Sequence, residues 1–349
     1  MTLVLEKQIG GPTTHAIVIG VGAYAHLIGG GGELFPDHES MGQLTSPPHS
    51  ARAFTNWLLK KHHNPNKPLA SLELLVSDVQ GSEFTLPNGE VTKIKSASKA
   101  NVEEAVWRWI GRGDESRDNL MIFYFCGHGI AGGPETALLL DDFGKRKLAP
   151  LNNEIDFRGF WLGMNKCKAR EQCYFVDACR RASSTLIESY NYAGDPIIPG
   201  TNLPSPLGRR HAPVYYSTVA GESAHSQPGA PSVFTEALLK ALDGAGSDDF
   251  EGDWRVYTDR LNIGITHLLE RLMGDDVRLE QVSPVDALTR FTLHYLDGKP
   301  IVPVTIGCRP SGANEAAELS YSYCDGSNKV IRPDAKSSDW DVDIEEGNY

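Results

Sequence analysis

Two short apolar runs in this chain each end abruptly in a chemically reactive side chain. Residues 119–130 read N-L-M-I-F-Y-F-C-G-H-G-I, and residues 173–181 read C-Y-F-V-D-A-C-R-R. Apolar runs of this length, bounded by glycine or polar residues, predict buried strands. In an open α/β sheet, chemistry is placed just beyond the carboxyl ends of the strands. The sequence therefore predicts that His128 and Cys179 lie at two strand ends of such a sheet.

Other apolar runs alternate with stretches of helical periodicity. Strands are expected at 15–24, 72–76, 136–140, 214–219 and 290–296, and helices at 46–61, 101–110, 155–168, 233–242 and 258–273. A polar hairpin is expected at 80–92, with Pro87-Asn88-Gly89 as its turn. Strands that alternate with helices predict parallel βαβ units with right-handed crossovers. The expected fold class is therefore α/β, with a mostly parallel sheet covered by helices on both faces.

The composition changes along the chain and suggests its organisation. The α/β core is expected over 1–296, and a glycine tract within it predicts a flexible loop at 26–45. A second loop at 184–212 is rich in proline and glycine, and loops of that length are usually functional or disordered. Residues 297–333 lose helical periodicity, which predicts a small β-rich appendage. The acidic segment 334–349 is poor in core residues, so we expect a disordered tail or an interaction tail.

The overall composition limits the partners and the compartment. The chain has 349 residues, of which 40% are hydrophobic and 22% charged, and its net charge is −12. This charge disfavours nucleic acid and anionic membrane surfaces as partners. No apolar run reaches the ~18 residues of a membrane span, and the N-terminus lacks the basic region of a signal peptide. Six cysteines are too sparse for a disulfide scaffold, so we expect a cytoplasmic, reduced protein that contacts neither nucleic acid nor membrane.

His128 and Cys179 have the chemistry of a base and a nucleophile. A cysteine attacks as its thiolate, and a nearby imidazole can take up the thiol proton. Gly127 and Gly129 flank the histidine, permit unusual backbone angles and give a substrate close access. The N–H groups of Gly129 and Cys179 are natural donors to a tetrahedral oxyanion. Alone, the first motif is compatible with a turn and the second with a buried structural cysteine, but their conjunction predicts a Cys–His dyad.

The motifs F-Y-F-C-G-H-G and F-V-D-A-C-R-R resemble the two catalytic motifs of the caspase–metacaspase superfamily. His128 precedes Cys179 by 51 residues, close to the separation of about 50 found in caspases. The resemblance covers roughly 13–296 and includes A-P-V-Y-Y-S-T-V-A-G-E-S-A, which is similar to the family's substrate-groove strand. It implies a caspase-like α/β/α sandwich and a cysteine endopeptidase that cleaves proteins. Prokaryotic relatives of this size include proteases of defence and cell death, so the resemblance also suggests that setting.

Departures from the caspase pattern concern the substrate residue N-terminal to the cut, P1. Caspases have Gln two residues before the nucleophile, whereas this chain has Asp177 there, as metacaspases do. The groove strand carries Glu222 close to where a caspase would supply an arginine. Carboxylates favour a guanidinium by charge and bidentate geometry. We therefore expect cleavage after Arg, or Lys, with Asp177 and Glu222 in the S1 pocket that binds the P1 side chain. If P1 is Arg, then Arg209 and Arg210 form a candidate self-processing site.

No resident cofactor or metal is expected from the sequence. Some metacaspases depend on calcium, and Asp141-Asp142 or Asp248-Asp249 would offer carboxylates, but clustered surface acids usually bind nothing specific. The C-terminal segment is a candidate contact for an activating protein partner. Two other functions stay open: a catalytically silent caspase-fold interaction module, and a Cys–His hydrolase of non-peptide substrates.

Overall fold

The computed structural model describes the whole chain except 133–134, 179–180, 183–185, 187–193, 200–209, 218–228, 251, 274–288, 335 and 348–349. Its main sheet runs in the order β1-β3-β2-β6-β10-β12. β1 is antiparallel to β3, and all other neighbours in this sheet are parallel, which confirms the predicted α/β class. The strands are β1 (Leu3–Glu6), β2 (Thr14–Val21), β3 (Leu69–Ser77), β6 (Leu120–Gly127), β10 (Glu171–Ala178) and β12 (Val214–Tyr216).

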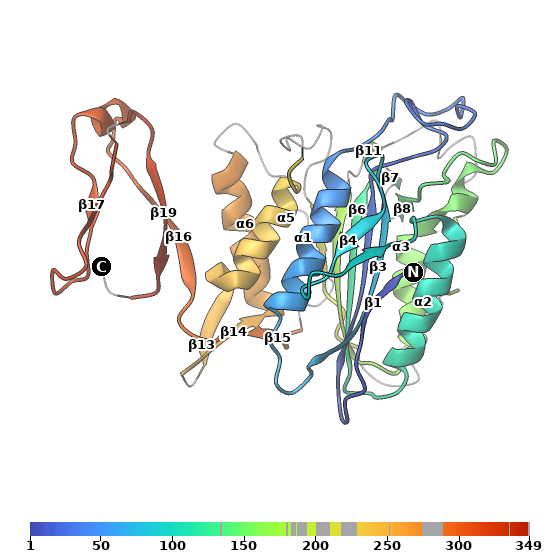
Figure 1. Cartoon of the computed structure of the whole chain (residues 1–349), viewed down its shortest axis with the longest axis horizontal. Coiled ribbons are helices and arrows are strands. Elements are labelled where there is room, and N and C mark those ends of the chain that lie inside the picture. Colours follow the sequence, from blue (N-terminus) through green and yellow to red (C-terminus); the bar gives the residue numbers. More distant parts are fainter. Residues whose placement is uncertain are drawn as a thin grey trace.

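Helices cover both faces of this sheet. Figure 1 shows α1 (Ser46–Lys60), α5 (Val233–Lys240) and α6 (Thr258–Met273) on one face, and α2 (Lys99–Gly113) and α3 (Phe157–Gly163) on the other. Because successive strand side chains point to opposite faces, Ile17 and Ile19 join the core under α2 and α3, whereas Val18 joins the core under α1, α5 and α6. None of the helices in the described residues has the length and hydropathy needed to cross a bilayer.

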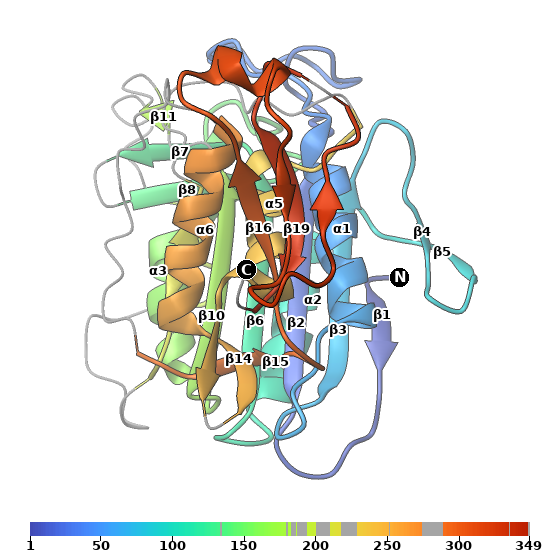
Figure 2. The same cartoon turned by 90° about the vertical axis from the view of Figure 1, so that its left-hand side faces the viewer.

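Two small sheets lie at opposite ends of the main strands (Figures 1 and 2). One has the order β11-β7-β8-β9 and continues from the carboxyl ends of β6 and β10. The other consists of β13, β14 and β15 in antiparallel order. The bounds are β7 (Gly129–Gly132), β8 (Glu135–Leu139), β9 (Glu154–Asp156), β11 (Arg181–Ala182), β13 (Ser247–Phe250), β14 (Asp253–Tyr257) and β15 (Thr292–Tyr295), and the predicted hairpin is β4 (Glu83–Thr85) with β5 (Val91–Lys93).

Some predicted elements differ in extent or in partner. The single helix expected over 155–168 is instead β9, α3 and a 3-10 turn at Met164–Lys166. Asp156 ends the strand and caps α3 by accepting a hydrogen bond of 3.0 Å from the Gly159 N–H, so the helix begins only at Phe157. The strand expected at 290–296 is present as β15, but it belongs to the small antiparallel sheet.

α5 continues into a π-helical turn at Ala241–Ala245, where Gly244 has a φ of 149°. Another 3-10 turn covers Pro150–Asn153.

Of the two alternatives predicted for the acidic tail, disorder is wrong for residues 340–345, and an interaction tail stays a prediction. These residues form β19 (Trp340–Glu345), which pairs antiparallel with β16 (Ile301–Ile306). Val302 faces Ile344 and Ile306 faces Trp340 across the ladder, so the acidic residues of W-D-V-D-I-E occupy the other face. The strong negative charge of the segment suggested a disordered tail, although apolar and acidic residues alternate with the period of a strand.

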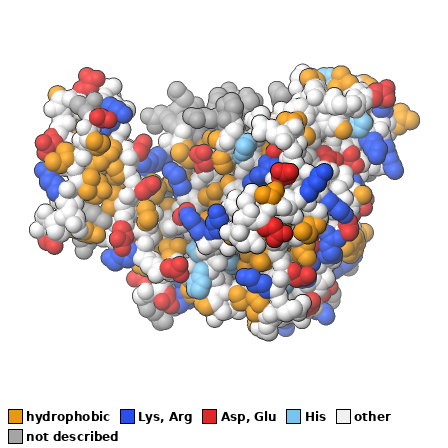
Figure 3. Space-filling view, viewed as in Figure 1, with side chains coloured by type: hydrophobic (Ala, Val, Ile, Leu, Met, Phe, Trp, Pro, Cys, Tyr) orange, Lys and Arg blue, Asp and Glu red, His pale blue; other side chains and the backbone are white. Residues whose placement is uncertain are grey.

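The appendage also contains a 3-10 turn at Ser311–Glu315, β17 (Ser320–Tyr321) and β18 (Val330–Ile331). Figures 1 and 2 place β16 beside α6, at the side of the core away from the main sheet. An ion pair of 2.6 Å between Arg271 of α6 and Asp341 of β19 links the two parts. Figure 3 shows hydrophobic side chains gathered on this appendage, while acidic and basic groups are mixed over the core beside it.

The burial pattern of β19 predicts which substitution opens the appendage. Ile344 is only 7% exposed, so Ile344→Ala should destabilise the β16–β19 pairing by about 2–5 kcal/mol through lost apolar burial. Amide hydrogen exchange of Ile301–Ile306 would measure this opening directly. Asp343→Ala is the matched control, because Asp343 lies exposed on the same strand. Equal exchange in the two variants would contradict the structural role given to Ile344.

Candidate active site

The imidazole of His128 is held at the point where β6 passes into β7. Its Nε2 lies 2.8 Å from the carbonyl oxygen of Gly42. A carbonyl only accepts hydrogen bonds, so Nε2 carries the proton and Nδ1 presents its lone pair. Nδ1 has no hydrogen-bond partner among the residues that the structure describes. Burial lowers the pKa of His128 from its ordinary 6.5, against the opposing effect of the Gly42 carbonyl. At neutral pH this histidine is therefore a neutral base.

Two residues that position His128 were not predicted from the sequence. Gly42 lies at the far end of the glycine-rich loop that was expected to be merely flexible, and its carbonyl fixes the imidazole tautomer. Tyr24 is buried, and its hydroxyl accepts a hydrogen bond of 2.7 Å from the backbone N–H of His128. The Tyr24 ring lies 4.9 Å from the His128 ring, centroid to centroid. Gly42 in the loop and Tyr24 just before it therefore hold His128 in place.

Of the two glycines beside His128, Gly127 has a role that differs from the one expected. Gly127 does not have a left-handed φ; it is needed for space, because a Cβ there would lie 2.8 Å from the Tyr24 hydroxyl oxygen. Gly129 faces Leu138 across the β7–β8 ladder, and the adjacent hydrogen bond runs from Leu139 N–H to His128 C=O. The alternation of an antiparallel ladder then leaves the Gly129 N–H outside the β7–β8 bonds. Gly129 thus keeps the donor that was predicted for an oxyanion hole.

The predicted nucleophile, Cys179, lies outside the described residues, as does Arg180. The chain is described on both sides of them. Ala178 at the end of β10 pairs with Gly127, and Arg181 in β11 pairs with Ile130. Both ladders are parallel and join positions that are 51 residues apart. This offset equals the sequence separation of His128 and Cys179.

Asp177 lies at the carboxyl end of β10 and is 8% exposed. Its Oδ2 accepts hydrogen bonds from the Ser232 hydroxyl, from the Thr235 hydroxyl at 3.0 Å and from the Cys126 thiol at 3.2 Å. Burial raises the pKa of Asp177 above its ordinary 3.8, and the hydrogen bonds from Ser232, Cys126, Thr235 and Ser217 oppose that rise. In the part of the chain that the structure describes, the donors to this carboxylate are thus neutral groups and not basic side chains.

Of the remaining predicted site residues, the structure describes only Arg210. Glu222 and Arg209 lie outside the described residues. Arg210 is described and is not a free surface side chain. It donates to the Trp161 carbonyl at 2.7 Å and to Gln172 Oε1 at 3.1 Å, and its guanidinium lies 4.4 Å from the Trp161 ring centroid. These contacts make Arg210 a structural anchor and leave Arg209 as the candidate for a cleavable position.

The carboxylates considered for calcium all have partners inside the protein. Asp141 accepts from the Ser77 hydroxyl at 2.8 Å, and Asp142 accepts from Asn153 at 2.8 Å. Asp249 accepts from the Gly252 N–H at 2.9 Å. Within the described ranges, no group of three or more His, Cys, Asp or Glu side chains is arranged to hold a metal ion. These aspartates therefore stabilise turns and loops in the structure.

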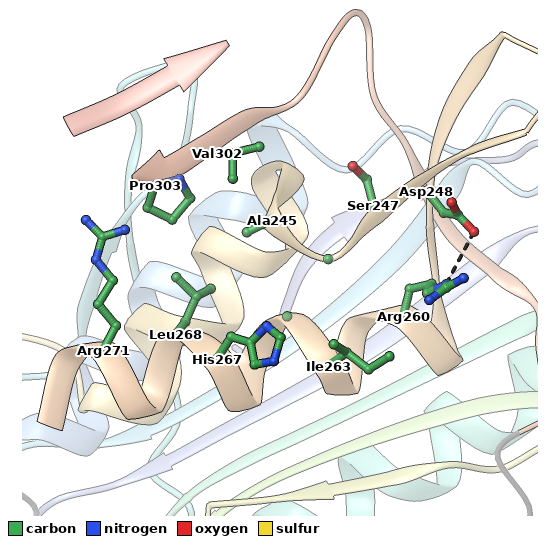
Figure 4. A pocket seen from close by; sticks show the side chains of 12 residues that line it. Ala245, Ser247, Asp248, Arg260, Ile263, His267, Leu268, Arg271, Val302 and Pro303 are labelled. Atoms are coloured by element: carbon green, nitrogen blue, oxygen red, sulfur yellow. Dashed lines mark hydrogen bonds and ion pairs between the residues drawn. The ribbon is translucent and has the colours of Figure 1, made fainter. Parts of the chain in front are cut away.

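A cavity of about 400 Å³ lies between α6, the π-helical turn and β16 (Figure 4). Asp248 is on its wall, paired with Arg260 at 3.3 Å, and a second arginine, Arg290, lies 3.1 Å from the same oxygen. None of the residues lining this cavity belongs to the strand ends that carry His128 and Asp177. The cavity is thus a feature of the junction between core and appendage, and the catalytic candidates do not line it.

The geometry around His128 predicts its state in solution. We expect the Nε2–H tautomer at pH 7 and a protonation midpoint below 6.5, because burial disfavours the imidazolium. Side-chain ¹⁵N NMR during a pH titration measures both quantities, and the spectrum of His128→Gln assigns the resonance. An Nδ1–H tautomer would contradict the hydrogen bond to Gly42, and a midpoint above 6.5 would contradict the dominant effect of burial on the pKa of His128.

Comparison with known proteins identifies the family of the chain. The family model of the caspase domain matches residues 13–262. An uncharacterized protein, y4kE, of Sinorhizobium fredii (strain NBRC 101917 / NGR234) is 30% identical over 267 residues, which cover 73% of this chain and 74% of that protein.

Two solved structures are also similar to the chain. They are a pro-sf-caspase-1 and caspase-1 from Spodoptera frugiperda, each 13% identical with a TM-score of 0.38. The matches cover 82% and 84% of this chain, and 93% and 92% of those chains. Such low identity and TM-score add no argument about activity. The family model spans most of the chain and confirms the resemblance seen in the two motifs, so the chain belongs to the caspase domain family of cysteine peptidases.

Proposed function

We propose that this protein is a cysteine endopeptidase whose nucleophile is Cys179 and whose general base is His128. The observation that carries the proposal is the shared offset of 51 residues in the β6–β10 and β7–β11 ladders. A parallel register that continues past both strand ends would bring position 179 opposite position 128. The family membership of the chain and the open Nδ1 of His128 support the same pairing.

The proposed reaction follows from these groups. The Cys179 thiol gives its proton to Nδ1 of His128, and the thiolate attacks the carbonyl carbon of the scissile peptide bond. The negative charge moves to the carbonyl oxygen, where the N–H groups of Gly129 and Cys179 would donate to it. His128 then passes the proton to the leaving amine as the C–N bond breaks, and a thioester remains. Water, deprotonated by the same imidazole, hydrolyses the thioester and restores the thiol.

The preferred P1 residue in this proposal is Arg, with Lys as the second choice. Asp177 belongs to the strand that leads to Cys179, and its buried carboxylate has only neutral donors among its described contacts. A guanidinium that reached this carboxylate would gain a charge-assisted hydrogen bond at a site shielded from water. Glu222 is proposed as a second acidic contribution to the same pocket.

Fluorogenic peptides that differ only at P1 test the dyad and the pocket together. We expect turnover with P1 Arg, a loss of at least about a hundredfold in kcat for His128→Ala, and background rates for Cys179→Ala. Turnover selective for P1 Asp would retain the dyad and reject the role of Asp177. A folded wild-type protein that cleaves no peptide would instead favour the silent interaction module or a non-peptide hydrolase. His267→Ala is the control variant, because His267 is exposed on α6 and lines the cavity beside the appendage, which the catalytic candidates do not line.

Self-processing is expected after Arg209, because Arg210 is held by Trp161 and Gln172. Intact-mass spectrometry of the purified protein should reveal two fragments that meet at this bond. Arg209→Gln and, separately, Cys179→Ala should each leave the chain whole. An active wild-type enzyme with an uncut loop at 184–212 would contradict self-processing. Fragments in the Cys179→Ala protein would also contradict it, because they would come from another protease.

A further inference from the structure

We propose that Ser232 and Thr235, at the start of α5, are positioning residues for Asp177, and that a preference for basic P1 residues depends on their two hydroxyl groups. This inference rests on the proposed function, because it takes Asp177 to be the carboxylate that meets P1. It adds residues from a different element, more than 50 positions along the chain, to the determinants of specificity.

The four residues involved form a closed, buried cluster. Asp177 is 8% exposed, Ser232 is 3% exposed, and Thr235 and Ser50 are fully buried. Ser232 is the N-cap of α5, since its hydroxyl oxygen accepts from the Thr235 N–H at 3.1 Å. The Ser232 N–H in turn donates to the Ser50 hydroxyl of α1 at 2.9 Å. Two helices on one face of the sheet therefore fix the hydroxyls that reach Asp177 at the end of β10.

The hydrogen positions in this cluster follow from counting donors. The hydroxyl of Ser232 and that of Thr235 each have one proton, and both oxygens lie within hydrogen-bond reach of Asp177 Oδ2. The Tyr124 hydroxyl, 2.6 Å from Thr235 Oγ1, can supply the bond that Thr235 then accepts. Ser232 Oγ also lies 2.9 Å from Thr235 Oγ1, but donation from both hydroxyl groups to Oδ2 is the arrangement that stabilises an ionised carboxylate. Hydrogen bonds donated to Oδ2 are stronger when the carboxyl group is ionised, so the cluster favours the charged form.

Among the described residues, the titratable groups that face Asp177 are two side chains of β6, and both are uncharged at neutral pH. They are Cys126 and Tyr124, and burial raises the pKa of each well above its ordinary value. The contacts from the start of α5 and from the residue after β12 are hydroxyl groups of Ser232, Thr235 and Ser217, and Ser50 of α1 lies behind Ser232. In the described residues, no arginine or lysine bonds to this carboxylate. Its charge is solvated by dipoles but not neutralised, so a cationic substrate side chain can still gain from it.

A purely structural role for the same hydroxyls is the competing explanation, because an N-cap also stabilises its helix. The two roles differ in what they predict for a pair of matched substrates. P1 Arg and P1 citrulline have nearly the same shape, but only Arg is charged. The ratio of kcat/KM for these substrates reports the charge of the pocket. Titration of His128 affects both substrates equally and cancels in the ratio.

The experiment compares the Arg/citrulline ratio, as a function of pH, in the full-length enzyme with Thr235→Val and Thr235→Ser. Thr235→Val removes one donor to Asp177 and keeps the backbone N–H that completes the N-cap. We expect the ratio at neutral pH to fall about tenfold, because the Asp177 carboxylate loses a donor that fixes its orientation and then meets the P1 guanidinium in poorer geometry. The loss of a donor to the ionised form also raises the pH below which the Arg preference disappears. Thr235→Ser restores the donor and should restore both values.

Ser232→Ala and Ser232→Thr form a second pair, which serves if Thr235→Val does not fold. Equal losses on both substrates, with an unchanged ratio and pH profile, would overturn the inference and leave the hydroxyls with a structural role. Failure of the proposed function gives a different result. In that case the wild-type enzyme shows no preference for Arg over citrulline, or Asp177→Asn leaves the preference intact.

Discussion

The parallel pairing of β6 with β10 is the interaction on which the rest of the structure depends. It places Gly127 opposite Ala178 and Cys126 opposite Asp177, so the two apolar runs end at the same level of the sheet. A shift by one residue would turn every side chain to the opposite face, and both cores would lose their apolar contacts. Hydrophobic burial along the strands thus fixes the register, and the register fixes which polar residues meet beyond it. The site is a consequence of core packing.

The sequence was sufficient for five of the six strands that make this sheet and for the two motifs at the strand ends, but it did not predict the edge strand β1. Both motifs are contiguous, with an apolar run and a reactive residue adjacent in the chain. The contacts that complete the site are not contiguous. Gly42 lies 86 residues from His128, Tyr24 lies 104 residues from it, and Thr235 lies 58 residues from Asp177. Nothing in the local composition of a glycine loop or of a helix start indicates which distant group it will meet.

The incorrect predictions share a physical cause. In the segment 334–349, charge was given more weight than alternation, although W-D-V-D-I-E has the period of a strand with one apolar face. At 155–168, hydrophobic spacing suggested a single helix, but the hydrogen bond from the Gly159 N–H to Asp156 defines a later start. At 290–296 the strand was recognised and its partners were not, because a β-type run does not encode which sheet it joins. Local propensity predicts an element, and tertiary contacts decide its bounds and neighbours.

Two buried carboxylates in this chain show how the same chemical group is used differently. Burial would raise the pKa of Glu73, but hydrogen bonds from Arg108, Thr2 and Arg112 outweigh that effect and lower it. Its charge is neutralised within the protein, between β3 and α2. Asp177 has hydroxyl and thiol donors instead, and burial keeps its pKa raised. A carboxylate already paired with arginine has little left to offer a cationic ligand, whereas one held by dipoles retains its charge. That contrast, together with its place at the end of β10, is the physical argument for Asp177 as a residue that meets substrate.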